Sequence, residues 1–349
     1  MKQKIIGVIS IIILTFFSYF VVRNILKWSP YVFQKQSLLT KTTPTPIPYK
    51  EITIPYLRSR IYKSTLGNLS EVYDYQNYKG YLTNYISDGL KINGLLTIPK
   101  GEKPAKGWPA IVFVHGYIPP TQYQTLEKYV DYVDYLARNG FVVFKIDLRG
   151  HGESDGKPGG GYFGSDYVVD TLNAYAALQS ADFINQKSIG LWGHSMAGNT
   201  VLRSMAINTN IPAIVIWAGA VYSYTDQAKY GIQDASYQRL NQTNSFSSGR
   251  PQQGVLGTYG RPAEGNNFWK LVAPTTYLND IRGAIQIHHA NDDETVNIGY
   301  SEDLISLLDK TKIPHEFYTY QTGGHNVYEP SFSLAIERTL IFYEKYLNQ

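Results

Sequence analysis

The sequence predicts an α/β fold built on a mostly parallel, doubly wound sheet. Three largely apolar runs are typical of strands that a parallel sheet buries on both faces, namely 110–114, 141–146 and 213–219. Segments with apolar residues at helical spacing separate these runs, which is the pattern of βαβ units. The motifs that carry recognisable chemistry each follow a predicted strand directly. Open α/β sheets bind their ligands at that edge.

The composition fits one large catalytic domain with an appendage. The chain has 349 residues, of which 17% are charged and 14% aromatic, and such a length buries a sizeable core. The formal net charge of +4 comes from scattered lysines and arginines, without the basic stripe of a nucleic-acid-binding protein. We therefore expect no nucleic-acid partner. The lack of cysteine excludes thiol catalysis, disulfides and cysteine-ligated zinc.

The N-terminal segment, residues 1–23, predicts a single-pass membrane anchor. Residues 5–22 carry no charge, and a membrane span needs about 20 apolar residues, with about 17 as the lower limit. Bulky residues at its exit, without an Ala-x-Ala-like site, favour a retained anchor over a cleaved signal peptide. The N-terminal positive charges slightly outnumber those that follow the span, so we expect the catalytic domain outside the cytoplasm. Residues 24–50, rich in threonine and proline, predict an extended linker.

The folded domain is expected over residues 51–349. It opens with a hairpin of two strands, 81–87 and 90–99, joined at Asp88-Gly89. The remaining expected strands are 188–192, 284–289 and 315–320, and the expected helices are 126–137, 165–181, 199–206, 297–310 and 331–347. Residues 221–268 interrupt this alternation, since they are rich in polar residues and tyrosine without a sustained period. A long insertion of this kind is usually functional, and we expect it to form a lid over the site.

Residues 193–198, Gly-His-Ser-Met-Ala-Gly, predict a nucleophile at Ser195. A serine between small residues at a strand-to-helix turn is a nucleophile elbow, usually written Gly-x-Ser-x-Gly. Ala197 takes the place of the last glycine and is small enough for the turn. Such a turn holds the hydroxyl above the sheet edge, with the following amides directed at a developing oxyanion. The alternative role of Ser195 is that of an ordinary helix N-cap.

The residues that a serine nucleophile requires follow it in the chain. Its proton needs a base, and the base needs an acid that fixes its tautomer. One predicted strand is followed by Asp292, Asp293 and Glu294, and the next is followed by His325 in a glycine-rich loop. The order Ser, Asp, His is the one found in α/β-hydrolases. The order alone leaves the three acidic residues open as the orienting acid.

From about residue 80 to its end, the chain resembles an α/β-hydrolase, and is most like the catalytic domain of the prolyl oligopeptidase family. That family includes dipeptidyl aminopeptidases and acylaminoacyl peptidases. The segments that carry the resemblance are 109–117, 147–156, 193–198, 273–278, 288–296 and 323–326. Relatives tend to read His-His-Gly, two residues, Asp, two residues, Val-Pro after strand seven, which implies that the acid is Asp293. Ala290 and Asn297 depart from this pattern.

The resemblance also implies an activity and an oxyanion hole. The hole is expected from the backbone amides of Tyr117, which follows His115-Gly116, and of Met196. The implied function is a serine peptidase that cleaves peptide or acyl-peptide bonds through an acyl-serine intermediate, without a cofactor. A carboxylesterase is the close alternative, because ester hydrolysis uses the same residues and the chain lacks room for the propeller domain of many relatives. A third hypothesis is a surface binding protein whose hydrolase fold has lost its activity. The presence of the serine, the acidic residues and the histidine in the expected order argues against it.

The other histidines and charged residues near these motifs are expected to be structural. The seven histidines lack the spacing of a metal site, and His288 and His289 should point to opposite faces of their strand. His115 is expected to pin its loop, and His194 to be only a neighbour of the site. We expect Asp147 and Arg149 to pair within a structural turn that Gly150 and Gly152 permit.

Overall fold

The computed structural model describes residues 47–159, 161–232 and 249–348. The membrane anchor expected over residues 1–23, and the linker as far as residue 46, lie outside these ranges. Among the helices within them, none has the length and apolar character needed to cross a membrane.

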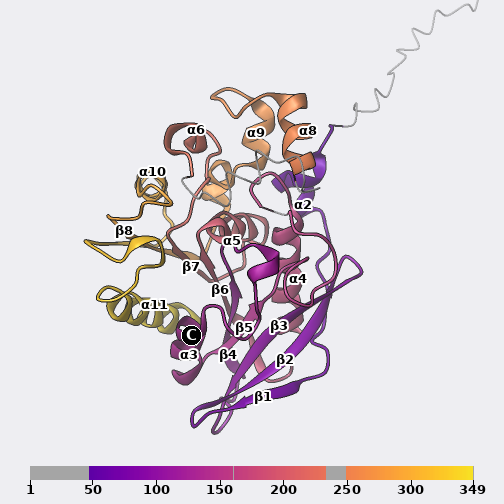
Figure 1. Ribbon diagram of the computed structural model, residues 1–349, viewed down its shortest axis with the longest axis vertical. Coiled ribbons are helices and arrows are strands. Elements are labelled where there is room, and N and C mark those ends of the chain that lie inside the picture. The colour runs from indigo at the N-terminus through magenta and orange to yellow at the C-terminus, as the bar shows by residue number, and fades with distance from the viewer. Residues whose placement is uncertain (1–46, 160, 233–248, 349) are drawn as a thin grey trace, which may run out of the picture. The chain divides into compact units, whose positions relative to one another are not determined.

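A nine-stranded sheet runs through the described part of the chain (Figure 1). The strands are β1 (Ser70–Asp74), β2 (Tyr78–Ser87), β3 (Leu90–Pro99), β4 (Trp108–Val114), β5 (Val142–Ile146), β6 (Ile184–His194), β7 (Ala213–Trp217), β8 (Ala284–Ala290) and β9 (His315–Tyr320). Their order is β1-β2-β3-β5-β4-β6-β7-β8-β9. The pairings up to β3·β5 are antiparallel, and the rest are parallel. The mostly parallel sheet expected from the sequence is confirmed, with β1 as an additional edge strand.

Helices cover both faces of this sheet. One face carries α4 (Asp166–Gln179), α5 (Met196–Ile207) and α10 (Gly299–Leu308), and the other carries α3 (Val130–Arg138) and α11 (Phe332–Leu347). Alternate residues of β4 serve the two layers: Val112 and Val114 belong to the first core cluster, and Ile111 and Phe113 to the second. This is why the run reads as continuously apolar.

The N-terminal edge of the described domain packs onto α5. Ile52 lies in the 3₁₀ helix η1 (Lys50–Ile52), and Ile54 and Leu57 lie in α2 (Ile54–Arg58); all three side chains are buried. The buried Arg203 of α5 donates from Nη2 to the carbonyl oxygen of Ile52 at 2.7 Å. The compact unit begins at Pro48 rather than at residue 51.

A protein that begins at Pro48 should therefore be much more stable than one that begins at Arg60. The shorter protein loses three buried aliphatic side chains, each worth about 1.5–3 kcal/mol of burial. It also leaves the buried Arg203 without one of its carbonyl acceptors. Thermal unfolding followed by circular dichroism measures the difference. Equal unfolding temperatures would show that residues 48–59 are not part of the folded core.

The expected lid is partly described, since residues 233–248 lie outside the described ranges. It contains α6 (Asp226–Tyr230) and α8 (Gly249–Tyr259), and is followed by α9 (Asn267–Val272). These helices gather at the upper end of Figure 1, on the side of the sheet that carries α5 and α10. Tyr222 and Tyr224 are buried, and the ring of Tyr259 stacks on Phe268 with centroids 3.6 Å apart. A lid function for this insertion remains a prediction.

Candidate active site

Ser195 lies at a strained turn between β6 and α5. Its backbone has φ 54° and ψ −120°, a conformation that costs a non-glycine residue about 1–3 kcal/mol. Its N–H donates to the carbonyl oxygen of Trp217 at 2.9 Å, and its carbonyl accepts from the N–H of Gly198 at 2.9 Å. Ser195 is half-buried and immediately precedes the N-terminus of α5, as expected for the elbow.

Two glycines make this turn possible. A Cβ atom at Gly193 would lie 2.6 Å from the carbonyl oxygen of Ala197, and one at Gly198 would lie 2.7 Å from the Cα atom of Gly219. Both contacts involve backbone, which cannot move aside cheaply. Ala197 itself is fully buried, so its methyl group fits where the usual motif has glycine. In this turn the position where the backbone comes too close for a Cβ atom is Gly198, one residue after Ala197.

Asp293 and His325 meet beside this turn, from the loops after β8 and β9. Nδ1 of His325 lies 2.8 Å from Oδ2 of Asp293. The Asp293 side chain is fully buried, whereas the His325 side chain is 18% exposed. In this geometry the Nδ1–H of His325 donates to the carboxylate of Asp293. Nε2, on the other side of the ring, can then accept a proton.

The three acidic candidates occupy different environments. Asp293 accepts from the backbone N–H groups of Thr295 at 2.8 Å and Val296 at 2.9 Å through Oδ1. Asp292 is exposed and accepts from the N–H of Gly324 at 2.8 Å. Glu294 is also exposed. Only Asp293 is bonded to the ring of His325, while Asp292 caps the loop that carries this histidine.

Asp293 has a second histidine partner that the sequence did not indicate as functional. Nε2 of His289 lies 3.2 Å from Oδ2 of Asp293, behind the contact with His325. Nδ1 of His289 lies 2.7 Å from Oγ of Ser301, which fixes the ring. Burial alone would raise the pKa of the Asp293 carboxyl, but the hydrogen bonds from His289 and His325 outweigh burial and lower that pKa well below its usual range. His289 thereby stabilises the charged form of the acid.

Replacing His289 by alanine should lower stability at neutral pH more than at acidic pH. A hydrogen bond to a buried charged group contributes about 1.5–3 kcal/mol. Because the folded-state pKa of Asp293 is lowered, its stabilising effect is present above the unfolded value of about 3.9 and is lost as the pH falls through the folded value. Urea unfolding at pH 7 and at successively lower pH values measures this. A stability difference that did not shrink with falling pH would exclude Asp293 as the cause.

The expected oxyanion-hole residues both lie at this edge of the sheet. Met196 is buried and is the first residue of α5. Tyr117 is half-buried, in the loop between β4 and the 3₁₀ helix η2 (Pro120–Gln122). The preceding residue, Gly116, donates its N–H to the hydroxyl oxygen of Tyr129 at 3.0 Å. The amide of Gly116 is therefore occupied, and that of Tyr117 is the next one along the loop.

The turn after β5 differs from the expectation in its ion pair. Arg149 pairs with Asp170 of α4, its Nη2 lying 2.6 Å from Oδ1, and not with Asp147. Asp147 instead accepts hydrogen bonds from Tyr123 and Thr125. Leu148, which lies between them, has a left-handed φ of 53° and not the extended backbone that would place the side chains of residues 147 and 149 on one side. The prediction of an Asp147–Arg149 pair was wrong.

His115, His288 and His289 are buried, and their rings are hydrogen-bonded to protein atoms. His115 is fully buried, and its ring nitrogens lie against the carbonyl oxygens of Gly116 at 2.7 Å and Asp147 at 3.2 Å. His288 faces Tyr320 and Thr339, whereas His289 faces Ser301, so the two point to opposite faces of β8. Across the described ranges, no group of three or more histidine and acidic side chains could hold a metal ion.

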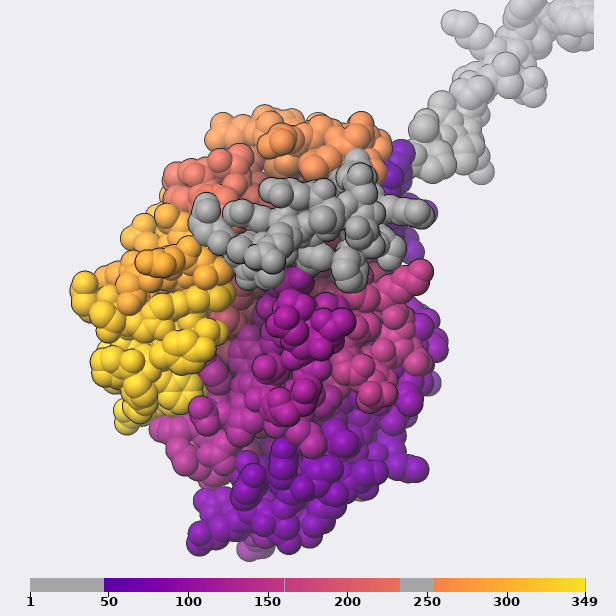
Figure 2. Space-filling view, viewed as in Figure 1, coloured from indigo at the N-terminus to yellow at the C-terminus, as the bar shows by residue number. Residues whose placement is uncertain are grey.

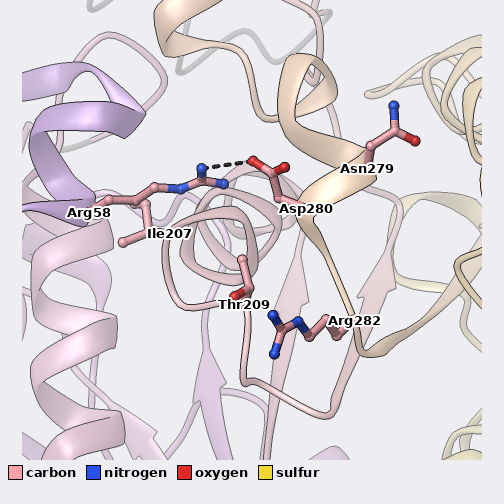
Figure 3. Close-up of a pocket in the computed structure, with 6 residues that line it drawn as sticks. All are labelled: Arg58, Ile207, Thr209, Asn279, Asp280 and Arg282. Carbon is pink, nitrogen blue, oxygen red and sulfur yellow. Dashed lines mark ion pairs between the residues drawn. The ribbon is translucent and has the colours of Figure 1, made fainter.

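A shallow cleft lies at the opposite ends of the strands from these residues (Figure 3). Its volume is about 470 Å³, and it is lined by Arg58, Ile207, Thr209, Asn279, Asp280 and Arg282. The guanidinium of Arg58 is already engaged, with Asp280 at 2.7 Å and with the carbonyl oxygen of Ala206. The cleft lies where α5 ends and β7 and β8 begin, so it is not part of the site around Ser195.

Comparison with known proteins gives matches to both peptidases and esterases. Residues 107–242 match the family model described as serine aminopeptidase, S33. An uncharacterized peptidase, YtmA of Bacillus subtilis, is 23% identical over 269 residues, which is 76% of this chain and 93% of that protein. Dipeptidyl peptidase 8 of Homo sapiens is 24% identical over 261 residues, which is 73% of this chain but only 27% of that protein.

The structural similarity extends to an esterase of comparable length. The acetyl xylan esterase from Paenibacillus sp. R4 aligns with a TM-score of 0.62 and 17% identity, over 84% of this chain and 92% of that chain. Dipeptidyl peptidase 4 of Porphyromonas gingivalis aligns with a TM-score of 0.59 and 20% identity, over 78% of this chain and 36% of that chain. At such identities the alignments show a shared fold.

Proposed function

We propose that this chain, which has the fold of an α/β-hydrolase, is a serine peptidase that cleaves peptide or acyl-peptide bonds. One observation carries the proposal: a buried carboxylate, that of Asp293, holds the ring of His325 at 2.8 Å beside the strained turn of Ser195. A serine hydroxyl becomes a nucleophile when a positioned histidine takes its proton.

The proposed reaction proceeds through an acyl-serine intermediate. The hydroxyl oxygen of Ser195 attacks the substrate carbonyl while Nε2 of His325 accepts the hydroxyl proton. The amides of Tyr117 and Met196 stabilise the resulting oxyanion. The proton then passes from His325 to the leaving amine as the acyl bond to that amine breaks. Water then attacks the acyl carbon while His325 takes its proton, the bond between that carbon and the oxygen of Ser195 breaks, and His325 returns the proton to the serine oxygen. Throughout, Asp293 keeps the Nδ1–H of His325 oriented and stabilises the imidazolium.

Peptide and ester substrates both fit this chemistry. The match to the serine aminopeptidase model and the 23% identity with a peptidase of similar length support the peptidase. A carboxylesterase is the second candidate, because an acetyl xylan esterase aligns over 92% of its own length.

A substrate panel separates these activities. The panel compares p-nitrophenyl acyl esters with aminoacyl and dipeptidyl p-nitroanilides, and a fluorophosphonate probe counts active serines. We expect labelling of Ser195 and measurable cleavage of the anilides. Cleavage confined to the esters would support the carboxylesterase instead. An absence of labelling in a folded protein would contradict both and favour a binding protein.

A further inference from the structure

We propose that His194 is a positioning residue that holds the loop of His325 and the loop of Tyr117 in place around Ser195. This inference rests on the proposed function, since it assigns a role within the same site. The sequence had suggested only a neighbour of the nucleophile. The structure instead gives the His194 side chain hydrogen bonds to two other segments of the site.

The contacts form one continuous chain of hydrogen bonds. Nε2 of His194 lies 2.9 Å from the carbonyl oxygen of His325. Nδ1 of His194 lies 2.8 Å from the hydroxyl of Tyr129. The oxygen of that hydroxyl accepts the N–H of Gly116 at 3.0 Å. Segments after β4, β6 and β9 are therefore joined through a single imidazole.

Only one assignment of protons satisfies every atom in this chain. A carbonyl oxygen can only accept, so Nε2 of His194 carries the proton that it donates to His325. Nδ1 of His194 is then bare and accepts the hydroxyl proton of Tyr129. Burial, together with the nearby His325, lowers the pKa of His194 to about 3, so the ring is neutral, as this assignment requires.

The side chains around His194 and Tyr129 restrict the movement of these hydrogen-bonded groups. His194 is 3% exposed, and its ring centroid lies 4.6 Å from that of His325. The ring of Tyr129 packs edge-on against Phe113 and Trp192. A second side chain, Tyr132, donates from its hydroxyl to the carbonyl oxygen of Asn326 at 2.7 Å. The backbone of residues 325–326 is thus held by two side chains, that of His194 at the end of β6 and that of Tyr132 in α3.

The two loops have independent backbones, and His194 is their common partner. Figure 2 shows the C-terminal segments in yellow adjoining the magenta segments of the middle of the chain on one face. Reaction geometry is sensitive to such placement, because a misplacement of about 1 Å can lower a rate about 10²-fold. A side chain that fixes both loops acts on turnover without touching the substrate.

The test uses His194→Ala, His194→Gln, Tyr129→Phe and the double variant His194→Ala/Tyr129→Phe. Turnover is expressed per active serine, as counted by fluorophosphonate titration, so that misfolded protein does not enter the rate. We expect His194→Ala to lower kcat about 10- to 100-fold with KM little changed. His194→Gln should recover most of the loss, since its carboxamide offers one donor and one acceptor. The double variant should be no slower than His194→Ala alone, because both changes break the same chain.

His288→Ala is the matched control. It removes another fully buried, hydrogen-bonded histidine, on the face of β8 away from Asp293. We expect it to lower the unfolding temperature while leaving kcat per active serine near the wild-type value. A kcat for His194→Ala within about twofold of wild type would overturn the proposal, as would a His194→Gln variant no faster than His194→Ala. Failure of the proposed function shows separately, as a wild-type Ser195 that the probe does not label.

Discussion

Replacing Ser195 by alanine is expected to lower turnover about 10⁶-fold, the loss found when a nucleophile that acts as a unit with its base is removed. The variant keeps Asp293, His325 and the two oxyanion amides, so any residual rate reports binding and electrostatic stabilisation alone. Alanine also removes nothing that the turn requires, because the hydrogen bonds of Ser195 that shape the elbow come from its backbone N–H and carbonyl. The fold should therefore survive, and steady-state kinetics with circular dichroism measures both properties.

Ser204 provides the matched control for this variant. It lies on the same helix, α5, is fully buried, and donates its hydroxyl to the carbonyl oxygen of Thr200 at 2.8 Å. We expect Ser204→Ala to retain turnover within about threefold and to be labelled by the fluorophosphonate as wild type is; a loss of one buried hydrogen bond of about 1 kcal/mol affects stability only. If Ser195→Ala were still labelled, or kept a turnover near that of the wild type, the nucleophile would be another residue.

Much of the fold could be predicted because burial leaves a direct mark on the sequence. Strands β5, β7 and β8 are buried over their whole length and β4 and β6 over most of theirs, so these runs stand out. The ends of the predicted strands indicated the edge that carries Ser195, Asp293 and His325. Strand β1 was missed since it lies at the sheet edge, where its five residues are exposed or half-buried and show no alternation.

The helix expected from residue 126 begins at Val130. Residues before it are held by the buried Lys145, which donates to the carbonyl oxygens of Thr125 and Lys128.

The candidate site was predictable where its residues follow a motif, and not where they act through tertiary contacts. The bond between Asp293 and His325 joins residues predicted from order and pattern. The contacts of His194 could not be read from its spacing, since its partners come from other loops. His289 and Asp293 are only four residues apart, but the chain leaves the strand between them, so the period of the strand does not predict their contact. The Asp147–Arg149 pair failed for a related reason: a left-handed residue between them, Leu148, separates side chains that a strand would place on one side.

The acid gives the second large effect. Asp293→Asn is expected to lower turnover about 10⁴-fold, because the amide favours the wrong tautomer of the histidine it contacts while serine and oxyanion hole remain. Asp292→Asn should lower turnover only about two- to tenfold, through the position of the His325 loop. The structure motivates the contrast: Asp293 is buried and bonded to the ring of His325, whereas Asp292 is exposed and bonded to the backbone of Gly324. Measurement of kcat for both variants, with folding checked by circular dichroism, tests it.

The adjacency of the two carboxylates makes the double variant informative. If Asp292 takes over part of the role of its neighbour, the kcat of Asp293→Asn will stay above that of the double variant Asp292→Asn/Asp293→Asn. The kcat of the double variant then gives the full loss caused by removing the orienting carboxylate. Such rescue requires the exposed carboxylate to leave the amides of Gly323 and Gly324 and to reach a ring that Asp293 already contacts at 2.8 Å. Breaking that cap would displace the loop that presents the base, so we expect the rescue to be small. An Asp292→Asn variant as slow as the double, with Asp293→Asn near wild type, would instead identify Asp292 as the acid and contradict the geometry on which the assignment rests.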